Sequence, residues 1–246
     1  MPGGEHLSAI PTSMAKNKAS LRDVLAKQPL FRQLSGRALD RMADGTAELR
    51  VGKGTSLFSK GDLVGGFYVV VYGQVKLSLP SDHGTEKVID LVGPGESFGE
   101  AIMFLGTPSL VSATALADAL LLLISRDVVM DQIERDPVFA RGMLASLSMR
   151  LHTMVKDVET YTLRSSTQRV IGYLLQYQPD DGESTNQLEI RLPASKYVIA
   201  SRLNLTKETL SRIFHELSQA ALINVRGKQI DVLDVAKLRE YGTEHH

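Results

Sequence analysis

The chain has 246 residues, with 28 Lys and Arg against 28 Asp and Glu, and it contains neither cysteine nor tryptophan. At about 100–200 residues per domain, this length indicates one large domain or two medium ones. Without cysteine the chain can form no disulfide, no thiolate metal site and no cysteine-bound iron–sulfur cluster. Taken over the whole chain, the net charge of zero argues against a nucleic-acid partner.

The hydrophobic segments are short. The longest apolar run, Ala119 to Ile124, falls far below the roughly 20 residues that span a bilayer. The first residues also lack the charged and then apolar pattern of a secretory leader. We therefore expect a cytoplasmic protein with no membrane partner.

The apolar pattern of the N-terminal half changes once, from helical spacing to the short runs of β-strands. Residues 1–19 show no apolar period and are expected to form a mobile tail. Two short helical patterns follow, the second with Ser35 as a candidate N-cap. From Arg50 to Ser125, glycines separate short apolar runs at about 8–12-residue intervals, which predicts a jelly roll or sandwich. We place one domain over 20–126, with SDHGTE at 81–86 as a hairpin loop.

A helical connector is predicted over 127–164. Apolar residues recur there at alternating spacings of four and three, the a/d seam of a coiled coil. A helix packed only on its own domain is the alternative, but its apolar face would normally be wider. We predict a homodimer whose interface is formed by Leu144, Leu147, Leu151, Met154, Val158 and Tyr161, with Ala140 beginning the seam.

A second domain is predicted over 165–241, followed by a short tail at 242–246. Ser165 or Ser166 is expected to cap a helix at 169–177, before a strand at LEIRLP and a terminal strand pair around INVRGKQIDVLD. Between them, residues 194–218 contain two close-set helices. This order of elements is typical of a small α+β unit.

The two close-set helices match a helix-turn-helix. Four residues are expected to form the inner face of the first helix: Tyr197, Ile199, Ala200 and Leu203. Asn204 stands where a tight turn needs a positive φ, and Thr206 is a good N-cap for the second helix. Leu210, Ile213 and Leu217 supply the inner stripe of that helix. A short turn between two such helices is typical of this motif.

The outer face of the second helix carries groups that read DNA. Glu208 can accept a hydrogen bond from cytosine, Arg212 can donate two to guanine, and Ser211 can contact a base or a phosphate. Lys207 projects from the same end. A solvated polar face with an internal Glu208–Arg212 pair is the alternative. Between 191 and 228, however, Lys and Arg occur at 191, 196, 202, 207, 212, 226 and 228, against Glu at 208 and 216 only. The neutral total therefore hides a local basic excess.

These residues resemble the Crp/Fnr superfamily of transcription regulators. The similarity covers nearly the whole chain: KETLSR at 207–212 after RLNLT, GPGESFGEA at 93–101, LSMRLH at 147–152, and GKQIDVLD. It implies an α+β fold with an N-terminal cyclic-nucleotide-binding-like β-roll (jelly roll), a long dimerisation helix and a C-terminal winged helix-turn-helix. It also implies a non-enzymatic, dimeric regulator that binds double-stranded DNA near TTGAT-NNNN-ATCAA and recruits RNA polymerase. The implied DNA contacts are Ser195, Thr206, Lys207, Glu208, Ser211, Arg212 and His215.

The resemblance also implies an effector pocket in the roll. Cyclic-nucleotide-binding members hold the ribose with Gly-Glu and the phosphate with an Arg just before Ser-Ala. The chain keeps Gly99-Glu100 and Ser112, but Leu110 and Val111 stand where the Arg would be. A buried phosphate without its cation is unfavourable, so cyclic AMP is not expected. The predicted pocket consists of Gly99, Glu100, Met103, Leu110, Val111 and Ser112.

The stretch at 97–115, with RLH at 150–152, looks most like the Dnr branch, which is associated with nitric oxide sensing through haem. Histidine is a common axial ligand, and His152 is the candidate ligand of choice. The other candidate ligands are His83, His215 and His6. Each has an alternative role: His83 as a turn residue, His215 as a phosphate contact and His6 as part of the tail. A ligand-independent regulator with a vestigial pocket remains open. A cupin-like enzyme is excluded, because its metal site would need several histidines and His83 is the only histidine between 50 and 125. A serine hydrolase is disfavoured because no Gly-x-Ser-x-Gly elbow occurs.

Overall fold

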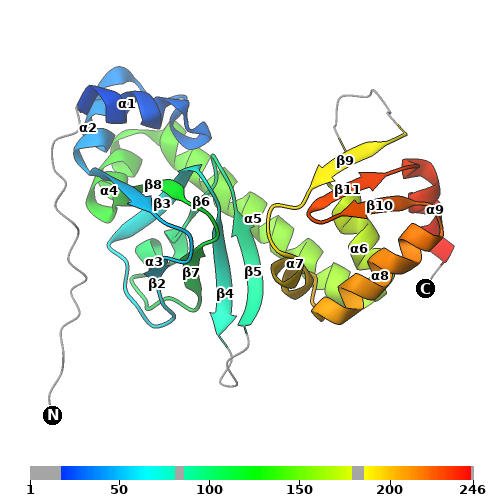
Figure 1. Cartoon of the computed structure of the whole chain (residues 1–246). Coiled ribbons are helices and arrows are strands. Elements are labelled where there is room, and N and C mark those ends of the chain that lie inside the picture. Colours follow the sequence, from blue (N-terminus) through cyan, green and yellow to red (C-terminus); the bar gives the residue numbers. More distant parts are fainter. Residues whose placement is uncertain (1–17, 81–85, 179–185, 245–246) are drawn as a thin grey trace, which may run out of the picture.

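The structure, a computed structural model, describes residues 18–80, 86–178 and 186–244. It has two units joined by one long helix (Figure 1). Residues 81–85 of the predicted hairpin loop, which include His83, and His6 in the N-terminal tail lie outside the described residues, whereas Glu86 begins a strand. No helix within the described ranges combines the length and the apolar character needed to cross a membrane.

The N-terminal unit is the β-roll expected from the glycine-punctuated pattern. Its helices are α1 (Lys18–Lys27), the 3-10 helix η1 (Pro29–Phe31), α2 (Gly36–Asp44), α3 (Glu100–Leu105) and α4 (Arg126–Arg135). Its strands are β1 (Thr46–Val51), β2 (Ser56–Phe58), β3 (Gly66–Tyr72), β4 (Val75–Pro80), β5 (Glu86–Val92), β6 (Ser97–Phe98), β7 (Ser112–Ala115) and β8 (Ala119–Ser125). The strands form two antiparallel sheets with the orders β1-β8-β3-β6 and β2-β7-β4-β5.

Strand β3 divides the core of the roll by simple alternation. Successive side chains of a strand point to opposite faces. Tyr68 and Val70 therefore lie between the two sheets, where Tyr68 stacks on Phe98 with ring centroids 4.9 Å apart. Phe67 and Val69 point the other way, into a second cluster closed by the N-terminal helices and α4. The first sheet is thus buried on both faces, which accounts for the almost continuous apolar runs of β3 and β8.

The predicted helical connector consists of two helices, α4 and α5 (Pro137–Leu163). Asp136 separates them: its carboxylate accepts from the N–H groups of Val138 and Phe139, while Pro137 occupies the first turn of α5. Both features are typical of a helix N-terminus. Only Phe139 and Met143 of this 27-residue helix are buried, and most of its other side chains are exposed in a single chain.

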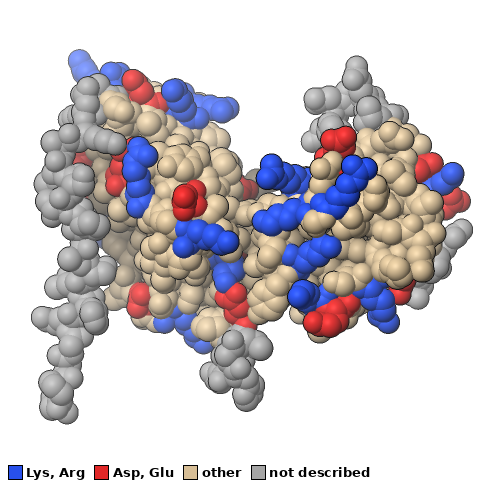
Figure 2. Space-filling model, viewed as in Figure 1, with Lys and Arg blue, Asp and Glu red and all other residues tan. Residues whose placement is uncertain are grey.

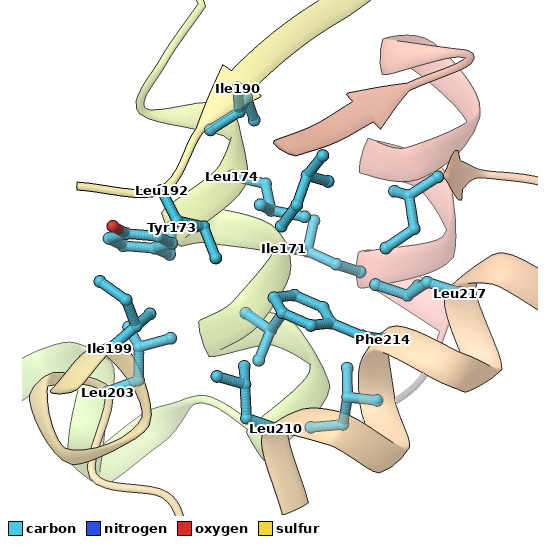
Figure 3. Packing of buried hydrophobic residues seen from close by; sticks show 14 of the residues in the cluster. Ile171, Tyr173, Leu174, Ile190, Leu192, Ile199, Leu203, Leu210, Phe214 and Leu217 are labelled. Atoms are coloured by element: carbon cyan, nitrogen blue, oxygen red, sulfur yellow. The ribbon is translucent and has the colours of Figure 1, made fainter. Parts of the chain in front are cut away.

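The C-terminal unit, α6 to α9, is called the reading head below. It consists of α6 (Ser166–Leu175), β9 (Leu188–Arg191), α7 (Lys196–Arg202), α8 (Lys207–Gln219), β10 (Ile223–Arg226), β11 (Gln229–Val232) and α9 (Val235–Glu244). Its three-stranded sheet has the order β10-β11-β9. Ser165, one of the two predicted caps, forms a full capping box with Gln168. Figure 3 shows the shared core, to which Ile171 and Leu174 of α6 and Phe214 and Leu217 of α8 all contribute.

The tail predicted at 242–246 is partly wrong, because α9 extends to Glu244. Its packing explains the difference: Leu238 is fully buried, and Ile171 of α6 lies against Gly242. The helix was missed because its apolar positions are few and its partner lies on α6, far away in the sequence. The first strand also begins at Thr46, earlier than the predicted boundary at Arg50.

Candidate nucleic-acid interface and effector site

The helix-turn-helix of the reading head is fixed by local hydrogen bonds. Ser195 caps α7 by accepting from the N–H of Val198, and Thr206 caps α8 by accepting from the N–H of Thr209. Between the helices Asn204 has a φ of +57°. Asparagine adopts this left-handed conformation more readily than most residues with a side chain. The predicted cap Thr206 and the predicted turn at Asn204 are therefore confirmed, whereas the capping role of Ser195 was not predicted.

The inner faces of the two helices are largely as expected. Leu210, Ile213 and Leu217 are buried, and Phe214 joins them in the core (Figure 3). On α7 one assignment is wrong: Tyr197 is 48% exposed, whereas Val198 is buried. Residues next to each other on a helix point about 100° apart, so a one-residue error in the inner stripe turns a tyrosine outward.

The outer face of α8 is open to solvent. Lys207, Glu208 and Ser211 are exposed at its N-terminal end. The guanidinium of Arg212 pairs with Glu216 at 3.8 Å rather than with Glu208, the alternative partner considered above. The pair is loose and exposed, so it costs little to break. His215 lies one turn further on, 3.0 Å from the side-chain nitrogen of Gln219. The seven predicted DNA contacts thus belong to α8, its cap and the cap of α7.

Basic side chains surround this face. Figure 2 shows several Lys and Arg side chains close together where the reading head adjoins the roll. Arg191, Arg226 and Lys228 are exposed, whereas Lys196 is partly buried, with its ammonium 5.5 Å from the centre of the Phe214 ring. Arg202 differs, because its side chain is only 16% exposed and pairs with Asp157 of α5. Five of the seven basic residues counted between 191 and 228 are therefore exposed and available to a polyanion.

In the roll, Glu100 is already engaged by the protein itself. Gly99, with a φ of +92°, turns the chain into α3, and Glu100 follows with only 3% of its surface exposed. One carboxylate oxygen accepts from the Ser97 hydroxyl, and the other accepts from Arg150 of α5 at 2.9 Å. Arg150 also donates to the backbone carbonyl of Ser97. The buried carboxylate is thus fully paired.

The six predicted pocket residues have different surroundings: Gly99, Glu100 and Met103 belong to the start of α3, and the other three precede or begin β7. Met103 is buried in the cluster beneath the N-terminal helices, alongside Phe67. Leu110 is 77% exposed, and Val111 is only partly buried. The Ser112 hydroxyl accepts from the N–H of Lys60 at 3.0 Å. A short apolar stretch does not indicate which of its side chains point into the core and which point to solvent, so the sequence alone could not define the lining of a pocket here.

A cavity of about 840 Å³ lies between the roll and α5. Its lining includes Leu34, Phe139, Met149 and Arg150, and none of the six predicted pocket residues. The seam residue Met154 also borders it. Sequence analysis missed the cavity because it is formed by segments that are distant in the chain.

The predicted dimer seam is mostly solvent-exposed. Leu144, Leu151, Met154 and Val158 are exposed, and Leu147 is partly buried. Tyr161 does not share their surroundings: its hydroxyl donates to the backbone carbonyl of Arg202 and accepts from the Arg202 guanidinium. The hydroxyl of Tyr161 is thus used within the chain, and its place in the seam stays a prediction. His152 is exposed on the flank of α5 and does not line the cavity.

Strand β5 and helix α7 are in direct contact, which was not predicted. Val88 of β5 is fully buried within the hydrophobic core of the reading head. The ammonium of Lys87 donates to the carbonyl of Ser201 at 2.6 Å and lies 4.7 Å from the centre of the Tyr161 ring. Burial, with the nearby Arg202 and Arg169 cations, lowers the pKa of Lys87 to about 8. The roll and the reading head therefore form one packed assembly.

Comparisons with known proteins agree with this architecture. Residues 48–136 match the cyclic nucleotide-binding domain and residues 168–241 match the Crp-like helix-turn-helix domain. A solved structure described as a candidate cyclic nucleotide binding protein, from Ruegeria pomeroyi, is 30% identical, covers 93% of this chain and 99% of its own, and superposes with a TM-score of 0.59. The chain belongs to the Crp/Fnr family of transcription regulators.

Two further relatives support the same fold over most of the chain. The cyclic AMP receptor protein of Thermus thermophilus is 26% identical over 86% of this chain and 95% of its own length. FixK2 of Bradyrhizobium japonicum is 22% identical and superposes with a TM-score of 0.69 over 79% of this chain and 96% of its own. This regulator therefore combines an effector-type domain with a DNA-binding head, and its family consists of transcription regulators rather than enzymes.

The Glu100–Arg150 pair gives a direct prediction. Replacing Arg150 by Met leaves the buried Glu100 carboxylate with Ser97 as its remaining partner and should lower the free energy of unfolding by about 3–5 kcal/mol. The measurement is urea unfolding followed by circular dichroism. Arg135→Met, which removes an exposed pair with Asp131, is the matched control and should change stability by less than about 0.5 kcal/mol. A double variant that adds Glu100→Gln should recover most of the loss; equal stability of Arg150→Met and the parent would refute the argument.

Proposed function

We propose that the regulator binds DNA as a homodimer, reading a palindrome close to TTGAT-NNNN-ATCAA with the outer face of α8. The proposal rests on the N-terminal half of that helix, whose outer side chains are exposed to solvent. In helix-turn-helix proteins this half of the second helix meets base edges in the major groove. Here it presents Lys207, Glu208 and Arg212, with the Arg212 side chain 69% exposed. The sequence of the palindrome comes from the family resemblance.

We propose that two chains pair through the α5 seam, so that their two reading heads can bind one palindromic DNA site. Four exposed apolar side chains on one stripe of a helix form an unusual surface for a protein in water. Coiled-coil pairing buries such a stripe. A two-fold pair of heads then matches two half-sites about one helical turn apart. By family resemblance, the bound dimer recruits RNA polymerase to promoters.

The role of Arg212 can be tested in solution. Arg212→Ala should weaken binding to a labelled TTGAT-NNNN-ATCAA duplex by about 1–3 kcal/mol and relax preference at the guanine it reads. Fluorescence anisotropy at fixed salt, on the parent duplex and on duplexes altered at that base pair, measures both effects. Arg239→Ala on α9, away from α8, is the control. Unchanged affinity and selectivity in Arg212→Ala would remove α8 from the reading role.

The seam predicts the oligomeric state. Leu151→Glu places a charge in the apolar stripe and should shift the protein from dimer to monomer in sedimentation equilibrium. Its DNA affinity should fall by at least about tenfold, because one head alone makes half of the phosphate and base contacts. Leu105→Glu is matched, since Leu105 is 71% exposed but belongs to α3. A dimeric Leu151→Glu variant would contradict the assignment.

The candidate effectors can be compared by the groups that the residues of the roll and of α5 are able to bind. The phosphate of cyclic AMP would have no cationic partner, because Leu110 and Val111 stand where the family has an arginine. Glu100 is already paired with Arg150. Haem-dependent nitric oxide sensing, implied by the Dnr resemblance, does not fit the cavity: among the described residues that line it there is no histidine, cysteine or tyrosine, and Met149 and Met154 offer only the thioether ligand that accompanies a histidine in cytochromes. His152 lies outside that lining. The closed Glu100–Arg150 pair instead favours a second candidate, a family member that acts without a ligand in this pocket.

Two titrations separate these candidates. We expect no saturable heat from cyclic AMP in calorimetry and no stoichiometric Soret endpoint when the purified protein is titrated with haem. Absence of both supports the ligand-independent candidate. A one-to-one haem spectrum that is lost in His152→Ala but kept in His215→Ala would establish the haem proposal instead. Saturable cyclic AMP binding would contradict the argument from Leu110 and Val111.

A further inference from the structure

The outer stripe of α8 continues beyond the residues proposed to meet base edges. Because successive residues of a helix point about 100° apart, His215 and Gln219 lie on the same side of α8 as Glu208 and Arg212. Both side chains are exposed. His215 follows Lys207 by eight residues, which places it about 12 Å further along the helix axis. The face that the reading head turns toward DNA therefore includes a histidine.

This histidine is placed to meet the DNA backbone. In helix-turn-helix complexes the N-terminal residues of the second helix contact base edges in the major groove. The groove is about as wide as a helix, so the later turns of that helix pass the phosphates at its borders. Phosphate oxygens are charged acceptors and bind most strongly to charged donors. An imidazole is such a donor only when both of its nitrogens carry a proton.

In the absence of DNA, the ring of His215 makes a contact that uses an unprotonated nitrogen. Its Nε2 lies 3.0 Å from the Nε2 of Gln219. An amide nitrogen donates hydrogen bonds and does not accept them, so the ring nitrogen is the acceptor here. A ring nitrogen can accept only while it carries no proton. A proton on Nε2 would therefore break this hydrogen bond.

The charged groups around His215 are mostly cations. On α8 itself the carboxylate of Glu216 is paired with Arg212 at 3.8 Å, and Glu208 lies about two turns away. Among the described residues no carboxylate pairs with the imidazole. The elements that pack most closely on α8 are α6, α7 and β10. Their charged residues are Arg169, Lys196, Arg202 and Arg226, and their other titratable residues are Tyr173 and Tyr197. A DNA phosphate would therefore supply the anion that a charged imidazole lacks in the protein alone.

We propose that His215 is a proton-dependent phosphate contact: when the reading head binds DNA, Nε2 leaves Gln219, takes up a proton from solvent and donates to a phosphate oxygen. The inference rests on the proposed DNA-binding function. Histidine is the side chain whose charge ordinarily changes between pH 5 and 8, so a new anion is enough to move it between its two states. By linkage, a group that holds more protons in the complex than in the protein alone makes binding tighter as the pH falls. The regulator therefore binds its site more tightly at mildly acidic pH.

The test compares the pH dependence of DNA affinity among variants of this position. His215→Gln keeps a polar side chain that cannot be charged, and His215→Lys keeps a positive charge from pH 6 to pH 8. His152→Gln, which removes an exposed histidine of α5, is the matched control. Fluorescence anisotropy on the labelled duplex is measured at pH 6 and pH 8 over a series of salt concentrations. Circular dichroism and sedimentation confirm that each variant is folded and has the oligomeric state of the parent.

We expect the parent and His152→Gln to bind at least about tenfold more tightly at pH 6 than at pH 8, because each of two heads gains a charged contact. His215→Gln should lose most of this gain. His215→Lys should bind at pH 8 about as tightly as the parent binds at pH 6. At pH 6 the slope of log K against log salt should be shallower in His215→Gln than in the parent by about 1.8, the value for two phosphate contacts, and the slopes should agree at pH 8.

Two results would overturn the proposal: equal affinity of the parent at pH 6 and pH 8, or the parent's pH dependence retained in His215→Gln. A pH dependence that disappears in His215→Gln without a change in salt slope would overturn the phosphate contact, since the proton would then act elsewhere. Failure of the DNA-binding proposal itself is recognised separately. The parent and Arg212→Ala would in that case bind the TTGAT-NNNN-ATCAA duplex equally at both pH values.

Discussion

The position of the recognition helix depends on one contact between segments that are far apart in the chain, the packing of α7 on β5. Val88 belongs to the roll by sequence but is fully buried in the core of the reading head. Burial of such a side chain contributes about 1.5–3 kcal/mol, which is large beside a typical net stability. The hydrogen bonds of Ser201 then fix the register of the contact. Everything that α8 presents to solvent is oriented through this joint.

A second constraint concerns the charge inside the roll. A buried carboxylate must be paired, and Glu100 is paired by Arg150 from the long helix. The same carboxylate, if left free, would be the natural partner of a ligand hydroxyl or ammonium group. The pair therefore links the interior of the roll to α5 and excludes a weakly bound guest from this position. Any ligand that uses Glu100 must compete with a guanidinium that is already held in place.

The sequence predicted best those features whose causes are local. The caps Ser35, Ser165 and Thr206, and the left-handed turn at Asn204, follow from the chemistry of a few adjacent residues. The alternation of β3 and β8 and the inner stripe of α8 follow from their periods. Contacts such as Lys87 with Ser201 have no such signature, because the two residues are 114 positions apart and each looks like an ordinary surface residue. Tyr161 kept the seam period yet contacts Arg202, so spacing alone did not distinguish two partners on one helix.

The last turns of α5 carry two sets of side chains that alternate along the same short segment. Met154 and Val158 are the exposed residues of the predicted dimer seam, while Asp157 and Tyr161 hold the end of α7. A stiff helix cannot bend or rotate one set without moving the other. Substitutions in this segment would therefore alter self-association and head orientation together. A change that tunes one of these two properties is therefore constrained by its effect on the other.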